Sequence, residues 1–587
     1  MVKRSLLVVV LGLGAFSLGC GGNDSGAGGG DGGDRGTGGR AGTGATAGTG
    51  ATGGAGATGG TGGISGSGGI ALGVEETTPQ DMATGIETDT PVAVRFDAAI
   101  DGRTVTTTSF TVRGIDGMPL AGNITVDVMG PGAIFTPRER LGLMATYTAT
   151  VTTAIESVDG DTLRTDYSWS FKTREGSWTG PVTLLPESSD DVALPTAAVD
   201  PNGNATAVWT QGRTAARVRA SHYRPGSDWQ GPEPVHDTLS GGSGQVEIAV
   251  DSDGHVIAVW TMGGLRGDIW SSRYTPGGGW GEAELIEVNN SGNAKNPHVA
   301  MAPNGDAVAV WSQSDGTRYN IWANRFTPQT AWGSAELIEA DNAGDAGGPR
   351  VAVDPSGNAI AVWMQTGATG QGIRANRFTP EMGWGTAQIL ETGRVGPAVT
   401  PQVGMDADGH AIAVWHQTDL LFRSDVWSKR FTPGAGWGGG QRVEMQDSVA
   451  TNPQIAVAPH GDAIAVWEQM GTMYKDVWGN HFTPESGWGT PALLEISNAG
   501  DAVFPRVAAD GAGNAIAVWM QGNGSEEDVW ANRYIPSSGW NGAVLLEQAD
   551  GVRARHPRIA LSPRGTAVAV WAQLVSMPTS LWANNFE

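Results

Sequence analysis

The chain has 587 residues, a formal net charge of −24 and 91 glycines. This length exceeds what one hydrophobic core can organise, so several domains or a repeat array are expected. The acidity argues against a nucleic-acid partner, which would require a basic surface. We expect the acidity to serve solubility, with an acidic binding surface as the alternative. The single cysteine, Cys20, excludes a disulfide within the chain.

The N-terminus has the pattern of an export signal. Two basic residues precede the apolar run SLLVVVLGLGAFSL, which is short for a transmembrane helix and ends in LGCGG. Residues 1–20 therefore resemble a bacterial lipoprotein signal, although Ser17 stands where that family usually has Leu. The resemblance implies a lipid on Cys20, and Gly21 after it resembles the outer-membrane sorting pattern. We expect an exported protein that is lipid-anchored at the outer membrane or cell surface; ordinary secretion is the alternative.

Residues 21–73 consist almost entirely of Gly, Ala, Thr and Ser, as in TGATAGTGATGGAGATGGTGG. Such a segment cannot bury enough apolar surface to offset the entropy lost on ordering. We therefore predict a disordered linker with a root-mean-square span of roughly 40 Å. Behind a lipid anchor, it would hold the following domains away from a membrane.

Residues 74–174 contain short β-rich runs separated by turn residues: PVAVRF, SFTVRG, ITVDVMG, AIFTP, YTATVTT and YSWSFKT. About seven strands in about 100 residues predict a β-sandwich. The pieces TPQDMATGIETDTPVAVRFDAAID, IFTPRERLGLMATYTATV and WSFKT resemble the bacterial immunoglobulin-like domains named after the S-layer protein SbsA. That resemblance implies a spacer or adhesive module without catalytic groups.

Residues 175–587 repeat with a period of 51 or 52 residues. The motif AVW ends at Trp209, Trp260, Trp311, Trp363, Trp415, Trp467, Trp519 and Trp571. A second tryptophan, usually in GW, recurs at Trp178, Trp229, Trp280, Trp332, Trp384, Trp437, Trp488 and Trp540. Each repeat has four strand-like runs, such as PRVAVD, NAIAVWMQ, GIRANRF and GTAQILE. Four strands per unit of this length predict an eight-bladed β-propeller, and the fold class is all-β.

The strand order within a blade follows from loop lengths. The longest connection precedes PxVAV, which suits the crossing from the outer strand of one blade to the inner strand of the next. The array begins with an outer strand at Trp178 and ends with a third strand, so we predict that these termini complete one blade and close the ring. We expect the AVW tryptophans to pack between blades, because the small alanines beside them leave room.

The inner hairpin carries a glycine six residues before each AVW tryptophan. Its sequence, as in DPSGN, fits a type I turn followed by a left-handed glycine. The glycines are Gly203, Gly254, Gly305, Gly357, Gly409, Gly461, Gly513 and Gly565. Two copies, DSDG at 251 and DADG at 406, faintly resemble calcium loops but lack the further carboxylates of a calcium cage. We predict no metal and no cofactor, with calcium at these two turns as the alternative.

These uniform turns lie on one face, and the loops that follow AVW, with the blade-crossing loops, lie on the other and vary. Varied loops on a rigid scaffold usually carry specificity, so we place any ligand site on that face or at its channel mouth. Gln recurs two residues after AVW in seven copies, and Glu closes the outer strand in six; both are expected to satisfy polar groups at strand ends. Polar rings around one face are the alternative.

The run DVWANRYIPSSGWNG and its relatives loosely resemble the repeats of fucose-binding lectin propellers. That resemblance implies sugar sites between blades, with an arginine and an aromatic ring. The candidates are Arg325, Arg377, Arg430 and Arg533, with Trp322, Trp427 and Trp530. DxxGNAxAVW also resembles the sialidase Asp-box, without its Ser or Thr start and between different strands.

No catalytic constellation is visible in the sequence: there is no HExxH, P-loop or GxSxG elbow, and histidines fall at irregular phases. We predict a surface-tethered, non-enzymatic binding or adhesion lipoprotein, monomeric, with a glycan or protein ligand at the cell envelope. A carbohydrate-active enzyme of sialidase or glycosidase type, using the propeller channel, is one alternative. A purely structural envelope protein is the other.

Overall fold

The computed structural model describes residues 71–587 except for short loop segments. These segments are 115–116, 128–130, 186–190, 213–216, 238–242, 264–265, 288–291, 340–343, 368–369, 392–395, 420, 422, 447, 497–498, 525, 548–551 and 575–578. The predicted signal, Cys20 and nearly all of the predicted linker lie outside the described residues. The described residues form strands and turns without a helix, and so include none long and apolar enough to cross a membrane.

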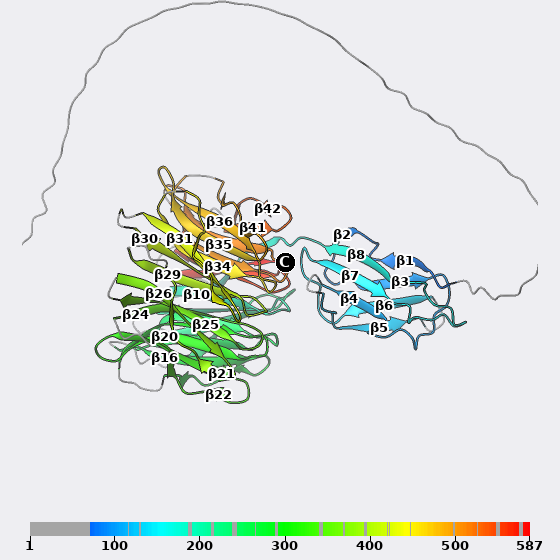
Figure 1. Ribbon diagram of the computed structural model, residues 1–587, viewed down its shortest axis with the longest axis horizontal. Coiled ribbons are helices and arrows are strands. Elements are labelled where there is room, and N and C mark those ends of the chain that lie inside the picture. The colour runs from blue at the N-terminus through cyan, green and yellow to red at the C-terminus, as the bar shows by residue number, and fades with distance from the viewer. Residues whose placement is uncertain are drawn as a thin grey trace, which may run out of the picture. The chain divides into compact units, whose positions relative to one another are not determined.

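The first domain is a sandwich of two four-stranded sheets (Figure 1). One sheet has the order β1 (Val74–Thr78), β3 (Val92–Phe96), β6 (Gly132–Pro137), β5 (Gly122–Val126). The other has the order β2 (Ala83–Ile86), β8 (Tyr167–Thr173), β7 (Thr146–Val151), β4 (Phe110–Arg113). Inward residues alternate with outward ones along β3 and β7, and aromatic side chains such as Phe110 and Trp169 fill the core. The sandwich predicted from the β-rich runs is confirmed; β1 and β2 were not among those runs.

The rest of the chain forms eight blades, and within each blade the strands run in order from the inner to the outer edge. Blade 1 is β10 (Val192–Val199), β11 (Ala205–Gln211), β12 (Arg217–Tyr223), β13 (Gln230–His236). Blade 2 is β14 (Ser243–Val250), β15 (Val256–Met262), β16 (Asp268–Thr275), β17 (Gly279–Trp280) with β18 (Glu284–Leu285). Blade 3 is β19 (Ala294–Met301), β20 (Ala307–Ser314), β21 (Tyr319–Thr327), β22 (Ala331–Trp332) with β23 (Glu336–Leu337). Blade 4 is β24 (Ala346–Val353), β25 (Ala359–Gly367), β26 (Gly370–Thr379), β27 (Gly383–Trp384) with β28 (Gln388–Ile389).

The remaining blades repeat this order. Blade 5 is β29 (Ala398–Met405), β30 (Ala411–Thr418), β31 (Ser424–Thr432), β32 (Gly436–Trp437) with β33 (Gln441–Arg442). Blade 6 is β34 (Ala450–Val457), β35 (Ala463–Met470), β36 (Lys475–Thr483), β37 (Gly487–Trp488) with β38 (Ala492–Leu493). Blade 7 is β39 (Ala502–Ala509), β40 (Ala515–Gly522), β41 (Glu527–Ile535), β42 (Gly539–Trp540) with β43 (Val544–Leu545). Blade 8 is β44 (Arg553–Leu561), β45 (Ala567–Leu574), β46 (Ser580–Phe586), β9 (Trp178–Leu185).

The ring closes through its two ends, as the strand order predicted. Strand β9 pairs antiparallel with β46, so the first strand of the array completes the last blade. Trp178 meets Phe586 at a centroid distance of 5.3 Å, the geometry that Phe326 and Trp332 show within blade 3. Each inner strand contacts the next around the ring, and β44 contacts β10. The all-β, eight-bladed architecture is therefore confirmed.

Packing between blades explains the repeated AVW. Trp363 is fully buried and lies in one apolar cluster with Val310 and Ile321 of the preceding blade. The opposite side of the same strand, at Ile360 and Val362, packs against Trp415 of the following blade. Each second strand is thus covered on both faces, and small alanines beside the indole leave the space that it fills.

The outer strand differs from the prediction of one continuous strand. In blades 2 to 7 it is two short pieces, both paired with the third strand, as β22 and β23 pair with β21. In blades 3, 4, 6 and 7 an asparagine of the third strand occupies the gap between them. Asn324 Nδ2 donates to the carbonyl of Gly333 in that gap, and to the carbonyl of Ile286 in the preceding blade. The break therefore allows one side chain to tie neighbouring blades together.

Candidate ligand site at the mouth of the propeller channel

Each inner strand presents one residue at the same register, opposite the valine of the AVW motif, as Arg350 lies opposite Val362. The eight residues, which we call the channel ring, are Thr196, Glu247, His298, Arg350, Gln402, Gln454, Arg506 and Arg558. Because the inner strands form a closed ring, these residues encircle the central channel. The sequence analysis did not identify them: the only signal is that seven of the eight directly follow the recurrent proline of PxVAV, whereas Glu247 follows Val246, and the residue type at this position varies.

The charged members of the channel ring act on one another across the channel. Desolvation opposes the ionisation of Glu247, but Arg558, His298 and Arg350 outweigh it and hold the pKa of the carboxyl below its usual value. Desolvation, with Arg350 and Arg558 adding to it, lowers the pKa of His298 to about 4. Arg350 and Arg558 belong to blades 4 and 8, which lie opposite each other in a ring of eight. Their side chains therefore share one enclosed space.

A bulge precedes the ring in each inner strand. The register shifts between residues such as Val503 and Arg506, and the residue before the proline has positive φ in seven blades. These residues are Leu194, Asn296, Gly348, Thr400, Asn452, Phe504 and His556. Positive φ is uncommon outside glycine, and bulges re-aim side chains at the rims of barrels and beside functional sites. Three of the seven, on blades 1, 7 and 8, line a cavity at the channel mouth.

This channel-mouth cavity has a volume of about 410 Å³. Its polar wall is formed by Arg506, Arg555, His556 and Arg558, with Glu527 as the one carboxylate. The rest of its wall is apolar: Leu194, Phe504, Met520 and Pro557. The volume and the mixture of apolar surface with a few polar groups are those of small-molecule sites.

The cavity lies on the face that the sequence analysis favoured. Met520 is close to the end of β40, and Glu527 begins β41, so both flank a loop of the varied face. Arg555 and His556 follow the crossing from blade 7 to blade 8. A smaller cavity of about 120 Å³ shares Arg555 and His556 and extends along Val192 and Leu574.

The cations of this cavity are crowded. Desolvation, together with Arg558 and Arg350, lowers the pKa of Arg506 to about 9. Desolvation lowers the pKa of His556, and the positive charges of Arg558, Arg555 and Arg506 lower it further. Arg506 Nη1 donates to the carbonyl oxygen of Pro505 at 2.9 Å, and Arg555 Nε lies 3.9 Å from Glu527. Among the described residues, Arg506 and Arg558 form no ion pair with a carboxylate.

The candidates taken from the lectin resemblance lie elsewhere, between blades. Arg325, Arg377, Arg430 and Arg533 each place the guanidinium over an aromatic ring of the next blade, at 4.6 to 5.7 Å from its centroid. Arg325 also bonds to Asp306 at 2.8 Å. Trp322, Trp427 and Trp530 are half-buried and pack against the clusters shared with the preceding blade. Arginine and tryptophan of one strand thus serve opposite faces and are not brought together.

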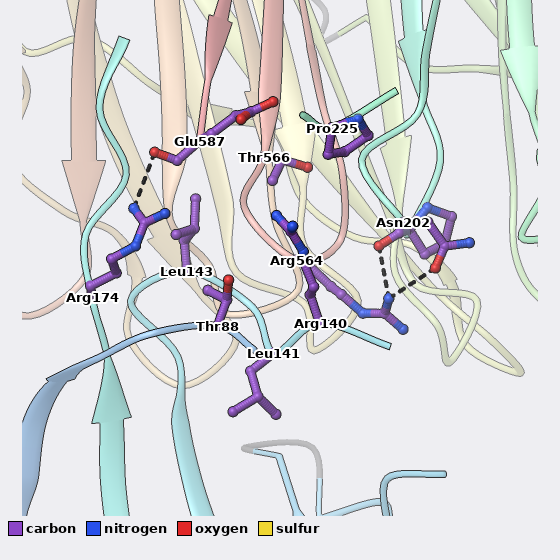
Figure 2. Close-up of a pocket in the computed structure, with 11 residues that line it drawn as sticks. Thr88, Arg140, Leu141, Leu143, Arg174, Asn202, Pro225, Arg564, Thr566 and Glu587 are labelled. Atoms are coloured by element: carbon purple, nitrogen blue, oxygen red, sulfur yellow. Dashed lines mark hydrogen bonds between the residues drawn. The ribbon is translucent and has the colours of Figure 1, made fainter. Parts of the chain in front are cut away.

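Two further cavities are smaller than the channel-mouth cavity. Arg377 lines one of about 140 Å³ with Phe431 and Trp437 of the next blade, so its aromatic neighbour there is the GW tryptophan. Figure 2 shows the other, where the loop at Leu141 and Leu143 meets Arg564 and Glu587. Its volume of about 30 Å³ admits about two water molecules. It is a packing gap, in which Arg564 Nη1 donates to the carbonyl of Pro201.

The recurrent polar residues satisfy buried groups in several blades, as expected, although among the described residues the indole N–H groups of Trp209, Trp415 and Trp571 have no hydrogen-bond partner. Gln365 Oε1 accepts from the indole of Trp363 at 3.2 Å, and Gln313, Gln469 and Gln521 do the same for their tryptophans. Glu444 accepts from the backbone N–H of Val426 at 2.8 Å, and Glu547 from that of Val529 at 2.7 Å. Their carboxyls also lie beside those of aspartates in several blades, and desolvation followed by Asp476 raises the pKa of Glu495 to about 8.

The eight turn glycines all have positive φ, between 78° and 98°. In the two calcium-like turns the first carboxylate is used internally: Asp251 and Asp406 each accept two backbone N–H groups and a histidine ring nitrogen. Within the part of the chain that the structure describes, no group of three or more His, Cys, Asp or Glu side chains could hold a metal ion.

One family model matches part of the chain. Residues 69–173 match the model of the bacterial Ig-like domain, which supports the sandwich assignment. No curated protein matches the chain. Similar solved structures include a protein of unknown function from Dyadobacter fermentans (12% identity, 70% of this chain and 99% of that one, TM-score 0.37).

Two other similar structures are enzymes. One is a polysaccharide lyase described as an ulvan lyase (12% identity, 63% of this chain and 98% of that one, TM-score 0.43). The other is an α-L-arabinofuranosidase from Fusarium graminearum (11% identity, 50% and 92%, TM-score 0.34). With TM-scores below 0.5, none of these likenesses bears on what this chain binds or catalyses.

Proposed function

We propose that the chain is a surface-tethered, non-enzymatic binding protein whose propeller takes a glycan ligand in the channel-mouth cavity. The lipid on Cys20 and the linker to residue 73 would attach it to the envelope, and the Ig-like domain would act as spacer. The observation that carries the binding role is the 410 Å³ cavity built on the bulged inner strands, on the face with varied loops.

The form of the cavity favours a sugar over a protein partner. A protein interface of standard size buries about 800 Å² on each partner and is broad. The cavity is instead concave, and it combines arginine donors with the ring of Phe504, which is 53% exposed. An exposed aromatic ring beside hydrogen-bond donors suits the apolar face and the hydroxyl groups of a sugar.

A second candidate function is a carbohydrate-active enzyme that uses the same cavity. Its specific support is His556, whose pKa is lowered by partial desolvation and by three neighbouring guanidiniums. The imidazole is therefore neutral near pH 7 and could accept a proton from a bound ligand. A structural envelope protein without a ligand is the third possibility.

A glycan array probed with the full chain separates the three functions. Binding to a defined glycan without any new product on prolonged incubation supports the binding role. Cleavage of the bound glycan, lost in His556→Ala, would establish the enzyme, and an array without a single positive would favour the structural role. The anchor is tested separately: lipid labelling in cells must disappear in Cys20→Ala.

A further inference from the structure

The chain is strongly acidic, with 60 Asp and Glu against 36 Lys and Arg. The channel-mouth cavity has the opposite balance. Arg506, Arg555 and Arg558 line it with His556, against the single carboxylate of Glu527. A concentrated patch of positive charge on an acidic protein requires an explanation beyond solubility.

The arrangement of these cations is unfavourable without a counter-charge. Desolvation, followed by Arg558 and Arg350, lowers the pKa of Arg506. The surroundings therefore destabilise the positively charged form of this side chain. Glu247 is the carboxylate that acts on Arg558 and Arg350 from within the channel, and Glu468 acts on Arg506. Glu468 is committed to Lys475 Nζ at 2.8 Å and to two N–H donors, from Asn452 and Phe504. Neither carboxylate is in ion-pair contact with Arg506 or Arg558. An anion entering the channel mouth would therefore meet two guanidinium groups that have no ion-pair partner among the described residues.

The apolar part of the wall defines the rest of the ligand. Phe504 is held at φ 55°, just before the buried Pro505, and its ring is exposed next to Arg506. A free phosphate or sulfate ion would leave this exposed ring uncovered. A pyranose with an acidic substituent would cover the ring with its apolar face and reach the guanidiniums with its charge.

We propose that the channel-mouth cavity binds an anionic sugar residue, a uronate or a sulfated sugar within an acidic polysaccharide. Arg506 and Arg558 hold its acid group, and Phe504 packs against its ring. This inference rests on the proposed function and names its ligand class. Guanidinium donors bind carboxylates and sulfates through paired charge-assisted hydrogen bonds, which are stronger than neutral ones.

The test is titration calorimetry of the full chain with three probes: oligogalacturonides, sulfated dextran oligomers and neutral dextran oligomers. We expect binding to at least one acidic probe, weakened by added salt, and none to neutral dextran. Arg506→Gln and Arg558→Gln should each weaken the acidic probe about tenfold or more, and Arg506→Lys should fall between. Arg103→Gln is the matched control, since its side chain is 90% exposed on the Ig-like domain.

The variants also report whether folding is the cause. Because Arg506 is repelled by Arg558 and Arg350, its removal should leave the thermal midpoint unchanged or raised. Wild-type affinity for the acidic probes in Arg506→Gln with Arg558→Gln would overturn the proposal. Equal binding of neutral and acidic dextran would also overturn it, while leaving the proposed glycan function intact; a glycan array without any binding would overturn both.

Discussion

At the scale of single residues, the sequence repeats because some positions of the blade accept only one type of residue. The turn glycine is the clearest of them. Gly409 has φ 81°, and a Cβ built there would lie 2.9 Å from Asp354 Oδ2 of the preceding blade. Glycine is thus required for two reasons: the backbone adopts a left-handed conformation, and the neighbouring blade leaves no space for a Cβ. The sequence predicted the first reason from DPxGN, but the second depends on the neighbouring blade.

The first prediction is that Gly409→Ala lowers the free energy of unfolding by about 1–2 kcal/mol, the cost of an L-residue in the left-handed region. The close contact with Asp354 adds to this cost. The measurement is the unfolding midpoint in denaturant. Gly439→Ala is the matched control, because a Cβ at that position would have no atom within 4 Å and its φ is not positive. Equal midpoints for both variants would contradict the account.

The second prediction concerns Glu495, which is 6% exposed and has its pKa raised to about 8 by desolvation and then by Asp476. A carboxyl with a folded pKa above its unfolded value of about 4.5 binds its proton more tightly when folded. Its contribution to stability is therefore complete below pH 4.5 and is lost as the pH rises to about 8.

The measurement is the thermal midpoint between pH 5 and pH 8.5 for the wild type and Glu495→Gln. The midpoint of the wild type should fall relative to that of the variant across this range. His298 and His416, each with a pKa lowered to about 4 by desolvation first, act in the opposite direction between pH 4 and 6.5. The contributions of these histidines cancel in the difference between the thermal midpoints of the two proteins. A difference that does not change with pH would show that Glu495 ionises normally.

At the scale of elements, neighbouring blades are joined by the asparagine of the third strand. This residue recurs in the sequence, but the sequence alone did not indicate its role. Asn376 Nδ2 donates to the carbonyls of Ile338 in blade 3 and Gly385 in blade 4, at 2.8 and 3.0 Å. Asn324, Asn480, Asn532 and Asn584 make the same bond to the preceding blade. The motif ANRF therefore serves assembly of the ring.

The third prediction is that Asn376→Ala lowers the free energy of unfolding by about 1–3 kcal/mol, because the buried carbonyl of Ile338 and the partly buried carbonyl of Gly385 lose their donor. Asn123→Ala, at an exposed position of β5, should change it by less than about 0.5 kcal/mol. Denaturant unfolding of both variants provides the comparison. A loss in Asn376→Ala no larger than that in Asn123→Ala would mean that water replaces the amide.

The sequence predicted most of the fold because its signals are local and repeated eight times. Alternation, turn residues and the 51–52-residue period identify blades, their strand order and their closure. The candidate site was not predictable in the same way. Arg506, Arg558 and Glu247 lie far apart in the chain, and only ring closure brings them to one channel. The bulge that exposes Phe504 also depends on the pairing of β39 with β40.

At the scale of the whole molecule, closure of the ring by β9 converts eight blades into one cooperative structure. Val182 pairs with Ala583, and Trp178 covers Phe586 at the outer end of the pair. A propeller whose ends are not joined would leave β46 as an exposed edge.

The fourth prediction is that Trp178→Ala lowers the free energy of unfolding by about 2 kcal/mol, less than for a fully buried tryptophan because Trp178 is half-buried. Hydrogen exchange should become faster in β9 and β46 before it does so in blades 2 to 6. Exchange that accelerates uniformly around the ring would contradict a closure limited to these two strands.

The central claim is that the channel mouth is the ligand site, and a crystal structure of the protein with a bound oligogalacturonide or sulfated oligosaccharide tests it most directly. We predict density at the channel mouth, with an acid group within hydrogen-bond distance of Arg506 and Arg558 and a sugar ring over Phe504. Density between blades, at Arg377 and Trp437, with an empty channel mouth would contradict it.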